Sequence, residues 1–231
     1  MLERKRLWDI SIFEIEMTDY HLLKDDLISF IYDYDSKLEP GEGGYGKGIG
    51  PHKQLHKYNL SESHGDLFLN ENEALQKLNT FCGQSLADLM HQLNGKYYDT
   101  NTWGVDFHDS WYHITKDGGY HDIHHHGKSA WCGIFYVDIG DSSAYNANGI
   151  NRFYSPLALD TTMGLEYIQH HAYDITPVSG KLVMFPGFLK HSAVPYHGDK
   201  DRIVVSFNAN LEVPEDSKLV GRSEPRVSRH K

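Results

Sequence analysis

A series of short β-type runs in the second half of the chain most constrains the fold. After Lys96, apolar and β-branched runs alternate with turn-forming residues as far as Val213. Short strands separated by turn signals are typical of an all-β sandwich or barrel. The runs are WYHIT, WCGIFYVD, INRFY, HHAYDI, KLVMF, HSAVPY and RIVVSFNANLEV.

The first half of the chain is expected to be mainly helical. Leu2 to Met17 indicates one or two short strands, and a helix is predicted from Thr18, which is a suitable N-cap. A second helix is predicted up to Gly95, since Asn70 and Glu73 form a capping-box-like start. Apolar residues recur at helical spacing at Leu23, Leu27, Phe30 and Ile31, and again at Leu75, Leu78, Cys82, Leu86, Leu89 and Leu93. Cys82 is therefore predicted to be a buried core residue rather than a nucleophile.

The glycine-rich segment from Glu39 to Gly50 resembles a phosphate-binding loop only in part. Gly41, Gly46 and Lys47 follow the G-x-x-x-x-G-K spacing, but Gly48 stands where a hydroxyl would hold magnesium. The flanking residues predict neither the strand nor the helix that the motif requires. The segment is therefore predicted to be a surface loop or lid.

Charge and cysteine content restrict the classes of function. A formal net charge of -10 disfavours nucleic-acid binding, because the chain would repel a phosphate backbone. No apolar run is long enough for a membrane-spanning helix, and acidic residues interrupt the N-terminal apolar stretch, which argues against a signal peptide. Two cysteines, Cys82 and Cys132, form no disulfide framework, so a reducing, cytoplasmic location is expected.

The stretch YHDIHHHG places four histidines in six residues, which raises the question of a metal site. Alternate side chains of a strand share a face, about 6.6 Å apart, so His124 and His126 can reach one ion while His125 points away. His121 is expected in the turn before the strand, and Asp122 has the parity of the pair but lies on the turn side. From these residues alone, a polar strand edge explains the pair equally well.

A third ligand is predicted at His191, which begins a strand after KLVMF and the turn PGFLK. Two neighbouring strands would then present three imidazoles at one mouth of a barrel and leave at least three coordination positions open. An open site of this kind lets non-haem iron bind a co-substrate and dioxygen together.

Arg202 opens the run RIVVSFN and shares a strand face with Ser206. An arginine that faces a barrel interior requires an anionic partner, because burying an unpaired charge is costly. A dicarboxylic acid beside the metal would supply that partner, and Tyr136 is placed to donate its hydroxyl to the same carboxylate. The alternative is a surface ion pair of Arg202 with Asp199 or Asp201.

Together these positions resemble the 2-oxoglutarate- and iron(II)-dependent oxygenases, in the prolyl-hydroxylase-like branch. The family pattern is H-x-D/E, a strand that often ends in tyrosine, a distal histidine and, shortly afterwards, arginine or lysine. The matching positions here are His124, His126, Tyr136, His191 and Arg202. The resemblance extends over residues 103–213 and is similar to a bacterial and phage subfamily with H-x-H at the first two positions.

The resemblance implies a mainly β fold with N-terminal helices, in which a double-stranded β-helix of the jelly-roll or cupin-like kind forms the core. The implied iron(II) ligands and catalytic residues are His124, His126 and His191. It further implies that 2-oxoglutarate chelates the iron and that Arg202, with Tyr136 and Ser206, binds its distal carboxylate. The implied reaction is hydroxylation of a peptide side chain or small metabolite by dioxygen, with release of succinate and CO2.

Two residues depart from the family pattern. His126 replaces the usual carboxylate, so the iron site would be one charge unit more positive, and Val204 replaces the serine of the commoner R-x-S pattern. The expected organisation is one oxygenase domain, with residues 1–96 as helical and mixed support, 97–213 as the β-helix core and 214–231 as a basic tail. Trp111 and His113, with the glycine-rich loop and residues 139–169, are expected to wall the substrate site. Neither the substrate nor the oligomeric state is indicated.

Two alternatives stay open from the sequence. A cupin-type dioxygenase would use the same three histidines without 2-oxoglutarate, and Gly118 and Gly180 fit its spacing. Its glutamate is missing between Lys128 and Trp131, however, and Arg202 would have no task. A non-catalytic β-sandwich binding module, with structural zinc or no metal, would explain the 15 tyrosines and 4 tryptophans.

Overall fold

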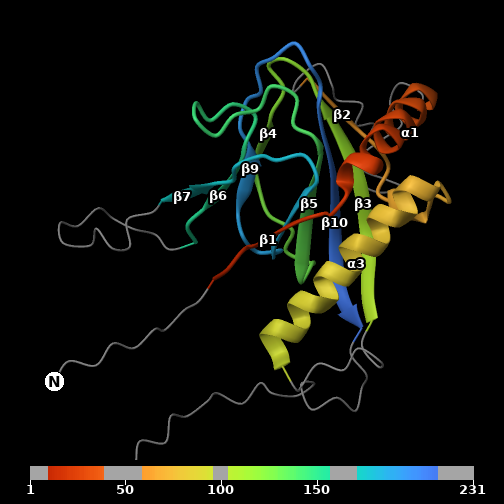
Figure 1. Ribbon diagram of the computed structural model, residues 1–231. Coiled ribbons are helices and arrows are strands. Elements are labelled where there is room, and N and C mark those ends of the chain that lie inside the picture. Colours follow the sequence, from red (N-terminus) through yellow and green to blue (C-terminus); the bar gives the residue numbers. More distant parts are fainter. Residues whose placement is uncertain (1–9, 39–58, 96–103, 157–170, 213–231) are drawn as a thin grey trace, which may run out of the picture.

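Two antiparallel sheets face each other, and two helices cover the outer face of the larger one (Figure 1). The computed structural model describes residues 10–38, 59–95, 104–156 and 171–212. The strands are β1 (Phe13–Glu16), β2 (Leu60–Glu62), β3 (Gly104–Thr115), β4 (His121–His124), β5 (Trp131–Asp138), β6 (Asn151–Tyr154), β7 (Ala172–Asp174), β8 (Lys181–Pro186), β9 (His191–Ala193) and β10 (Arg202–Glu212). The helices are α1 (Lys24–Lys37) and α3 (Glu73–Asn94), with single 3₁₀ turns η1 (Tyr20–Leu22) and η2 (Leu67–Leu69).

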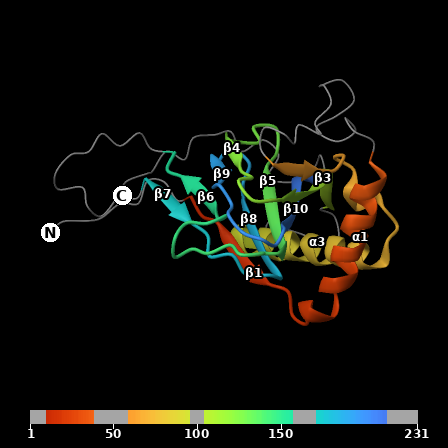
Figure 2. The ribbon, with the colours of Figure 1, turned by 90° about the horizontal axis from the view of Figure 1, so that it is seen from above.

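The larger sheet has the order β1-β8-β5-β10-β3-β2, and the smaller has the order β4-β9-β6-β7. Viewed from above, α1 and α3 lie on one side of the larger sheet and the smaller sheet lies on the other (Figure 2). All seven strands expected after Lys96 are present, which confirms the prediction of an all-β sandwich or barrel. The predicted helical support at residues 1–96 also supplies β1 and β2, the two edges of the larger sheet.

The central strands of the larger sheet divide their side chains between two cores. On β10, Ile203, Val205 and Phe207 pack against the helices, whereas Val204 packs on the side that faces the smaller sheet. Successive side chains of a strand point to opposite faces, so a continuous apolar run of this kind fits a strand that is covered on both sides. The parity predicted for this strand is therefore confirmed.

Helix α3 begins and ends at identifiable caps. The side chain of Asn72 accepts a hydrogen bond from the backbone N–H of Leu75 at 3.1 Å, and Gly95 ends the helix at a φ of 54°. The predicted start at Asn70 is two residues early, because the Asn70 side chain caps the backbone N–H of Asn72 instead. The predicted core positions are buried, Cys82 among them, except Leu93 in the last turn, which is 51% exposed.

Helix α1 starts later than the sequence predicts. Asp19 adopts a left-handed conformation with a φ of 57°, which interrupts any helix that begins at Thr18. The chain then forms η1, in which buried Tyr20 donates its hydroxyl to the carbonyl of Val137 at 2.7 Å. This bond ties the entry of the helix to β5. Of the predicted apolar stripe, Leu23, Leu27 and Ile31 are buried and Phe30 is partly buried.

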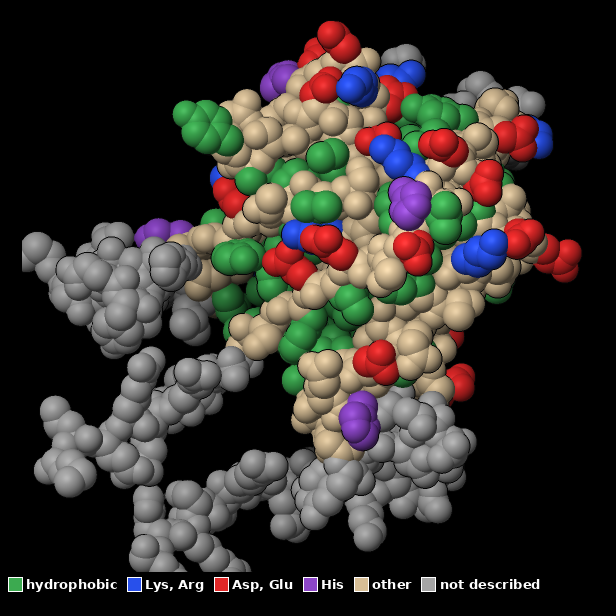
Figure 3. Space-filling view, viewed as in Figure 1, with side chains coloured by type: hydrophobic (Ala, Val, Ile, Leu, Met, Phe, Trp, Pro, Cys, Tyr) green, Lys and Arg blue, Asp and Glu red, His purple; other side chains and the backbone are tan. Residues whose placement is uncertain are grey.

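Several predictions fall on segments that lie outside the described residues. These are the glycine-rich loop at 39–50, the basic tail at 214–231 and part of the predicted substrate wall, at 157–169. Neither of the described helices is long and apolar enough to cross a membrane. On the face shown in Figure 3, the described basic side chains are interspersed among acidic ones and form no continuous basic patch.

Leu78→Ala should destabilise the protein strongly, because Leu78 on α3 is fully buried in the core that the helices form with the larger sheet. Loss of a buried leucine side chain costs about 2–5 kcal/mol in the free energy of unfolding. Leu93→Ala, on the same helix, is the matched control and should change that free energy by no more than about 0.5 kcal/mol. Chemical denaturation followed by circular dichroism measures both values, and equal effects would contradict this assignment of the helix face.

Candidate metal centre and co-substrate site

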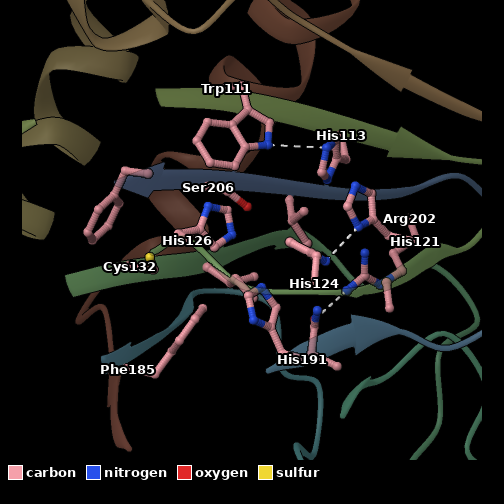
Figure 4. A pocket seen from close by; sticks show the side chains of 16 residues that line it. Trp111, His113, His121, His124, His126, Cys132, Phe185, His191, Arg202 and Ser206 are labelled. Atoms are coloured by element: carbon pink, nitrogen blue, oxygen red, sulfur yellow. Dashed lines mark hydrogen bonds between the residues drawn. The ribbon is translucent and has the colours of Figure 1, made fainter. Parts of the chain in front are cut away.

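Three histidines converge between the two sheets. His124 is the last residue of β4 and His191 is the first residue of β9, and the two are direct partners across these antiparallel strands. His126 follows two residues after the end of β4. Each imidazole offers one nitrogen, and these three nitrogens lie within 4.8 Å of one another (Figure 4). The structure therefore brings together the three side chains that the sequence predicts as metal ligands.

His126 reaches this point by a different route from the predicted one. The expected strand ends at His124, so strand alternation alone does not place His126. Its backbone N–H instead donates to the carbonyl of Gly187 at 2.7 Å, which holds it beside the turn between β8 and β9. Its ring stacks on Trp111, with ring centroids 6.0 Å apart.

Hydrogen bonds orient two of the three imidazoles. Nδ1 of His191 lies 3.0 Å from the carbonyl oxygen of Leu189, and Nδ1 of His124 lies 2.8 Å from that of Asp122. A carbonyl only accepts, so each Nδ1 carries the hydrogen and donates it. This tautomer leaves Nε2 with its lone pair for a metal ion, which is the usual arrangement of histidine ligands.

All three imidazoles are held in their neutral form. Burial lowers the pKa of His191 to about 2 and the pKa values of His124 and His126 to about 4, and neighbouring imidazoles add to each effect. Only neutral imidazole binds a metal ion, so these ligands need no deprotonation at pH 7. Imidazole nitrogen suits iron, zinc, copper and nickel, and three such donors leave coordination positions open. The donor set therefore fits iron(II).

The predictions for the other residues of the histidine segment agree with the structure in some cases and not in others. His125 is exposed, as predicted. Asp122 is also exposed, and its carbonyl rather than its carboxylate contacts the site. The prediction that His121 lies in the preceding turn is wrong: it is the first residue of β4, and its Nδ1 lies 3.0 Å from Nδ1 of His124. Pairing of His121 with Ala193 on β9 extends the strand far enough to include it.

Arg202 lines the same cavity as the imidazoles and is 2% exposed (Figure 4). Its NH2 group donates to Oδ1 of Asn151 at 2.7 Å, but its Nε–H has no hydrogen-bond partner among the residues that the structure describes. It forms no ion pair within the described residues, so the alternative of a surface pair with Asp199 or Asp201 is wrong. Burial lowers the pKa of the guanidinium. A buried cation with an unsatisfied N–H indicates a site for an anion.

Asn151 is a part of this site that the sequence analysis missed. Its Oδ1 accepts hydrogen bonds from both Arg202 and the hydroxyl of Tyr136, the latter at 2.8 Å. The only signal was an amide side chain within the predicted strand INRFY. Tyr136 was expected to donate to a bound carboxylate, but its hydroxyl is engaged by Asn151 and its ring centroid lies 5.5 Å from Cζ of Arg202. It therefore contacts both residues from behind the cavity wall.

The remaining cavity wall is mixed in character. Ser206 lies on β10 on the same face as Arg202, as predicted, and both residues line the cavity. Trp111 and His113, the predicted substrate walls on β3, also line it. Cys132 is buried beside them, its Sγ–H donates to Asn208, and burial raises the pKa of its thiol to about 12. The thiol therefore stays protonated and is not a nucleophile at pH 7.

A comparison with protein-family models finds one family that matches the β-rich half of the chain. Residues 109–208 match the family described as "Putative 2OG-Fe(II) oxygenase", and this segment contains the three histidines, Asn151, Arg202 and Ser206. Over this segment the chain is similar to the 2-oxoglutarate- and iron(II)-dependent oxygenases. The match supports what the resemblance implied: an oxidoreductase with iron(II) as its metal and 2-oxoglutarate as its co-substrate. No curated protein sequence matches the chain.

Solved structures share the fold of this oxygenase at low sequence identity. A prolyl-4-hydroxylase from Pseudomonas putida has a TM-score of 0.54 and 13% identity, covering 87% of this chain and 94% of its own. A prolyl hydroxylase from Trichoplax adhaerens, in complex with a hypoxia inducible factor peptide fragment, has a TM-score of 0.57 and 11% identity, and the match covers 86% of this chain and 82% of that one. HygX from Streptomyces hygroscopicus, with nickel and 2-oxoglutarate bound, has a TM-score of 0.52 and 11% identity, and the match covers 87% of this chain and 82% of that one. The predicted double-stranded β-helix fold is thereby confirmed.

The predicted metal ligands can be tested by substitution. His124→Ala and His191→Ala should each weaken iron(II) binding by more than about 100-fold, since loss even of a residue that only orients a ligand costs 10–100-fold. His125→Ala is the matched control within the same segment, and its exposed side chain should be dispensable. Anaerobic iron(II) titration measures the affinities, and circular dichroism checks the fold. Wild-type affinity in His191→Ala would exclude it as a ligand.

Proposed function

We propose that this oxygenase hydroxylates a peptide side chain or a small metabolite. In the proposed reaction, one oxygen atom of dioxygen enters a C–H bond of the substrate as a hydroxyl group. The other enters 2-oxoglutarate, which loses its carboxyl group as CO2 and becomes succinate. Atoms and electrons balance without a further reductant, because the oxidative decarboxylation of 2-oxoglutarate supplies two electrons.

The observation that carries this proposal is the buried Arg202 beside three neutral imidazoles. A ligand that satisfies both needs an anionic end for the guanidinium and metal-binding oxygens at the other end, as 2-oxoglutarate has. The unpartnered Nε–H of Arg202 would donate to the distal carboxylate, and Ser206, on the same strand face, would add a hydroxyl. Asn151 and Tyr136 would position the guanidinium, because Oδ1 of Asn151 accepts hydrogen bonds from both Arg202 and the hydroxyl of Tyr136.

In the proposed site, His124, His126 and His191 hold iron(II) through three neutral nitrogens. When bound, the metal supplies the redox chemistry that couples dioxygen to the substrate. Because no carboxylate is among its ligands, the loaded site would keep two positive charges, and Arg202, which lines the same cavity, adds a third. This concentration of positive charge in a buried site favours a dianionic co-substrate over a neutral one.

Two observations support the substrate class in the proposal. The Trichoplax neighbour binds a peptide fragment, and Trp111 provides an aromatic wall in the cavity of this chain, next to His126.

Both cysteines are buried free thiols, as expected of a protein from a reducing compartment, and we therefore propose a cytoplasmic location.

The test is turnover of 2-oxoglutarate to succinate by the iron-loaded protein. Succinate should form in an oxygen-dependent and chelator-sensitive manner, and a candidate peptide or metabolite should raise its rate and gain the mass of one oxygen atom. His191→Ala serves as the metal-site control. Oxygen consumption or substrate oxidation that needs no 2-oxoglutarate would contradict the proposal and favour a cupin-like reaction.

Arg202→Ala should raise the dissociation constant for 2-oxoglutarate by roughly 30-fold or more, because loss of one partner of a buried charge pair costs about 2–5 kcal/mol. Arg152→Ala is the matched control, since Arg152 forms an outward ion pair with Asp174 on the neighbouring strand. Anaerobic titration of the iron-loaded variants, followed by the visible absorption of the iron chelate, measures the constants. Equal constants for Arg202→Ala and wild type would remove Arg202 from the co-substrate site.

A further inference from the structure

A second cluster of metal-binding side chains lies beside the three-histidine site. Glu62, His113 and His121 each offer one ligand atom, and these atoms lie within 4.8 Å of one another. The cluster adjoins the first site directly, because Nδ1 of His121 is 3.0 Å from Nδ1 of His124. The proposed function uses none of these three side chains as a ligand.

The fold brings the three side chains together from two different sheets. Glu62 on β2 and His113 on β3 are direct partners across these antiparallel strands. His121 comes from β4, an edge strand of the smaller sheet, whereas β2 is an edge strand of the larger one. The rings of His113 and His121 stack with centroids 5.5 Å apart, across a boundary that no strand pairing joins (Figure 4).

The chemistry of the cluster favours a bound cation. The side chains of Glu62 and His113 are each only 13% exposed, and Oε2 of Glu62 lies 2.5 Å from Nε2 of His113. The same nitrogen lies 3.1 Å from Nε1 of Trp111, whose N–H can only donate. One nitrogen cannot accept from Trp111 and donate to Glu62 together. When it accepts from Trp111, this nitrogen has no hydrogen to donate to the largely buried carboxylate beside it, and a cation would offset the carboxylate charge that His113 then leaves.

We propose that Glu62, His113 and His121 form a second binding site for a divalent transition-metal ion. Two imidazoles and one carboxylate are the donors that zinc(II) and iron(II) share, whereas magnesium and calcium prefer oxygen ligands alone. An ion held here links the edge of the larger sheet to the edge of the smaller one. It also fixes His121, which contacts the ring of His124, and so positions a ligand of the first site.

Two neighbouring dications repel each other, so negative charge near the two ions favours filling both sites. The first site contributes no ligand charge to offset its ion, whereas Glu62 supplies one negative charge to the second. A dianionic co-substrate at the first site would reduce the repulsion further. Paired metal sites in one cavity are established in other enzymes.

The test is the number of zinc ions bound per chain. Untagged metal-free protein is equilibrated with zinc(II), weakly bound ion is removed by gel filtration, and zinc is measured by elemental mass spectrometry. The wild-type chain should retain two ions, Glu62→Gln one, His191→Ala one, and the double variant none. Glu62→Gln preserves the shape of the side chain and removes only the charge. Glu16→Gln, on the exposed edge strand β1, is the matched control and should retain two.

The outcomes separate this inference from the proposed function. One ion in wild type, lost in His191→Ala and kept in Glu62→Gln, would overturn the second site and leave the three-histidine site intact. Two ions in Glu62→Gln would also overturn it. Two ions in wild type and His191→Ala, with one in Glu62→Gln, would overturn the three-histidine site alone.

Hydrogen exchange adds a readout that does not depend on counting ions. In the His191→Ala background only the second site should be intact, so zinc should slow amide exchange in the segments of β2 and β4. The same addition to the double variant should leave exchange in both segments unchanged. Equal protection in the two proteins would contradict a metal link through Glu62.

Discussion

The site depends on the alternation of side chains along β10, which is hydrogen-bonded to β5 on one side and to β3 on the other. Ile203, Val205 and Phe207 secure one face of this strand against the helices, and that packing commits Arg202 and Ser206 to the opposite face. A slip of one residue in register would exchange the two sets. The hydrophobic core on the helical side thus forces a charged side chain into the space between the sheets.

The cost of burying that charge explains much of the cavity's chemistry. Asn151 satisfies one end of the guanidinium and is itself held by Tyr136, yet Nε of Arg202 has no acceptor in the described part of the chain. The same burial keeps the imidazoles of the metal site neutral. The site thus combines a buried cation with imidazole lone pairs that can bind a metal ion, and a chelating dianion would complement both. The fold is shared at low sequence identity with prolyl hydroxylases and HygX. The chemistry of the cavity follows from this chain's own side chains.

The cluster of Glu62, His113 and His121 places a carboxylate next to a three-histidine site that has none of its own. It lies where the edges of the two sheets approach each other without strand pairing. Side chains must supply the cohesion at such a boundary, because the backbone does not. A metal link at this position would couple the stability of the barrel's open edge to the geometry of His124.

The amino-acid sequence alone determined the features that depend on local periodicity: the strands, the apolar faces of both helices and the inward face of Arg202. It misplaced the start of α1, because the left-handed conformation of Asp19 has no signature in an apolar pattern. Only the tertiary structure decided that Asn151 takes the hydroxyl of Tyr136, that the turn at Gly187 holds His126, and that Glu62 meets His113 and His121. The physical reason is that periodicity decides which face a side chain occupies, whereas strand register and loop closure decide which distant side chain it meets there.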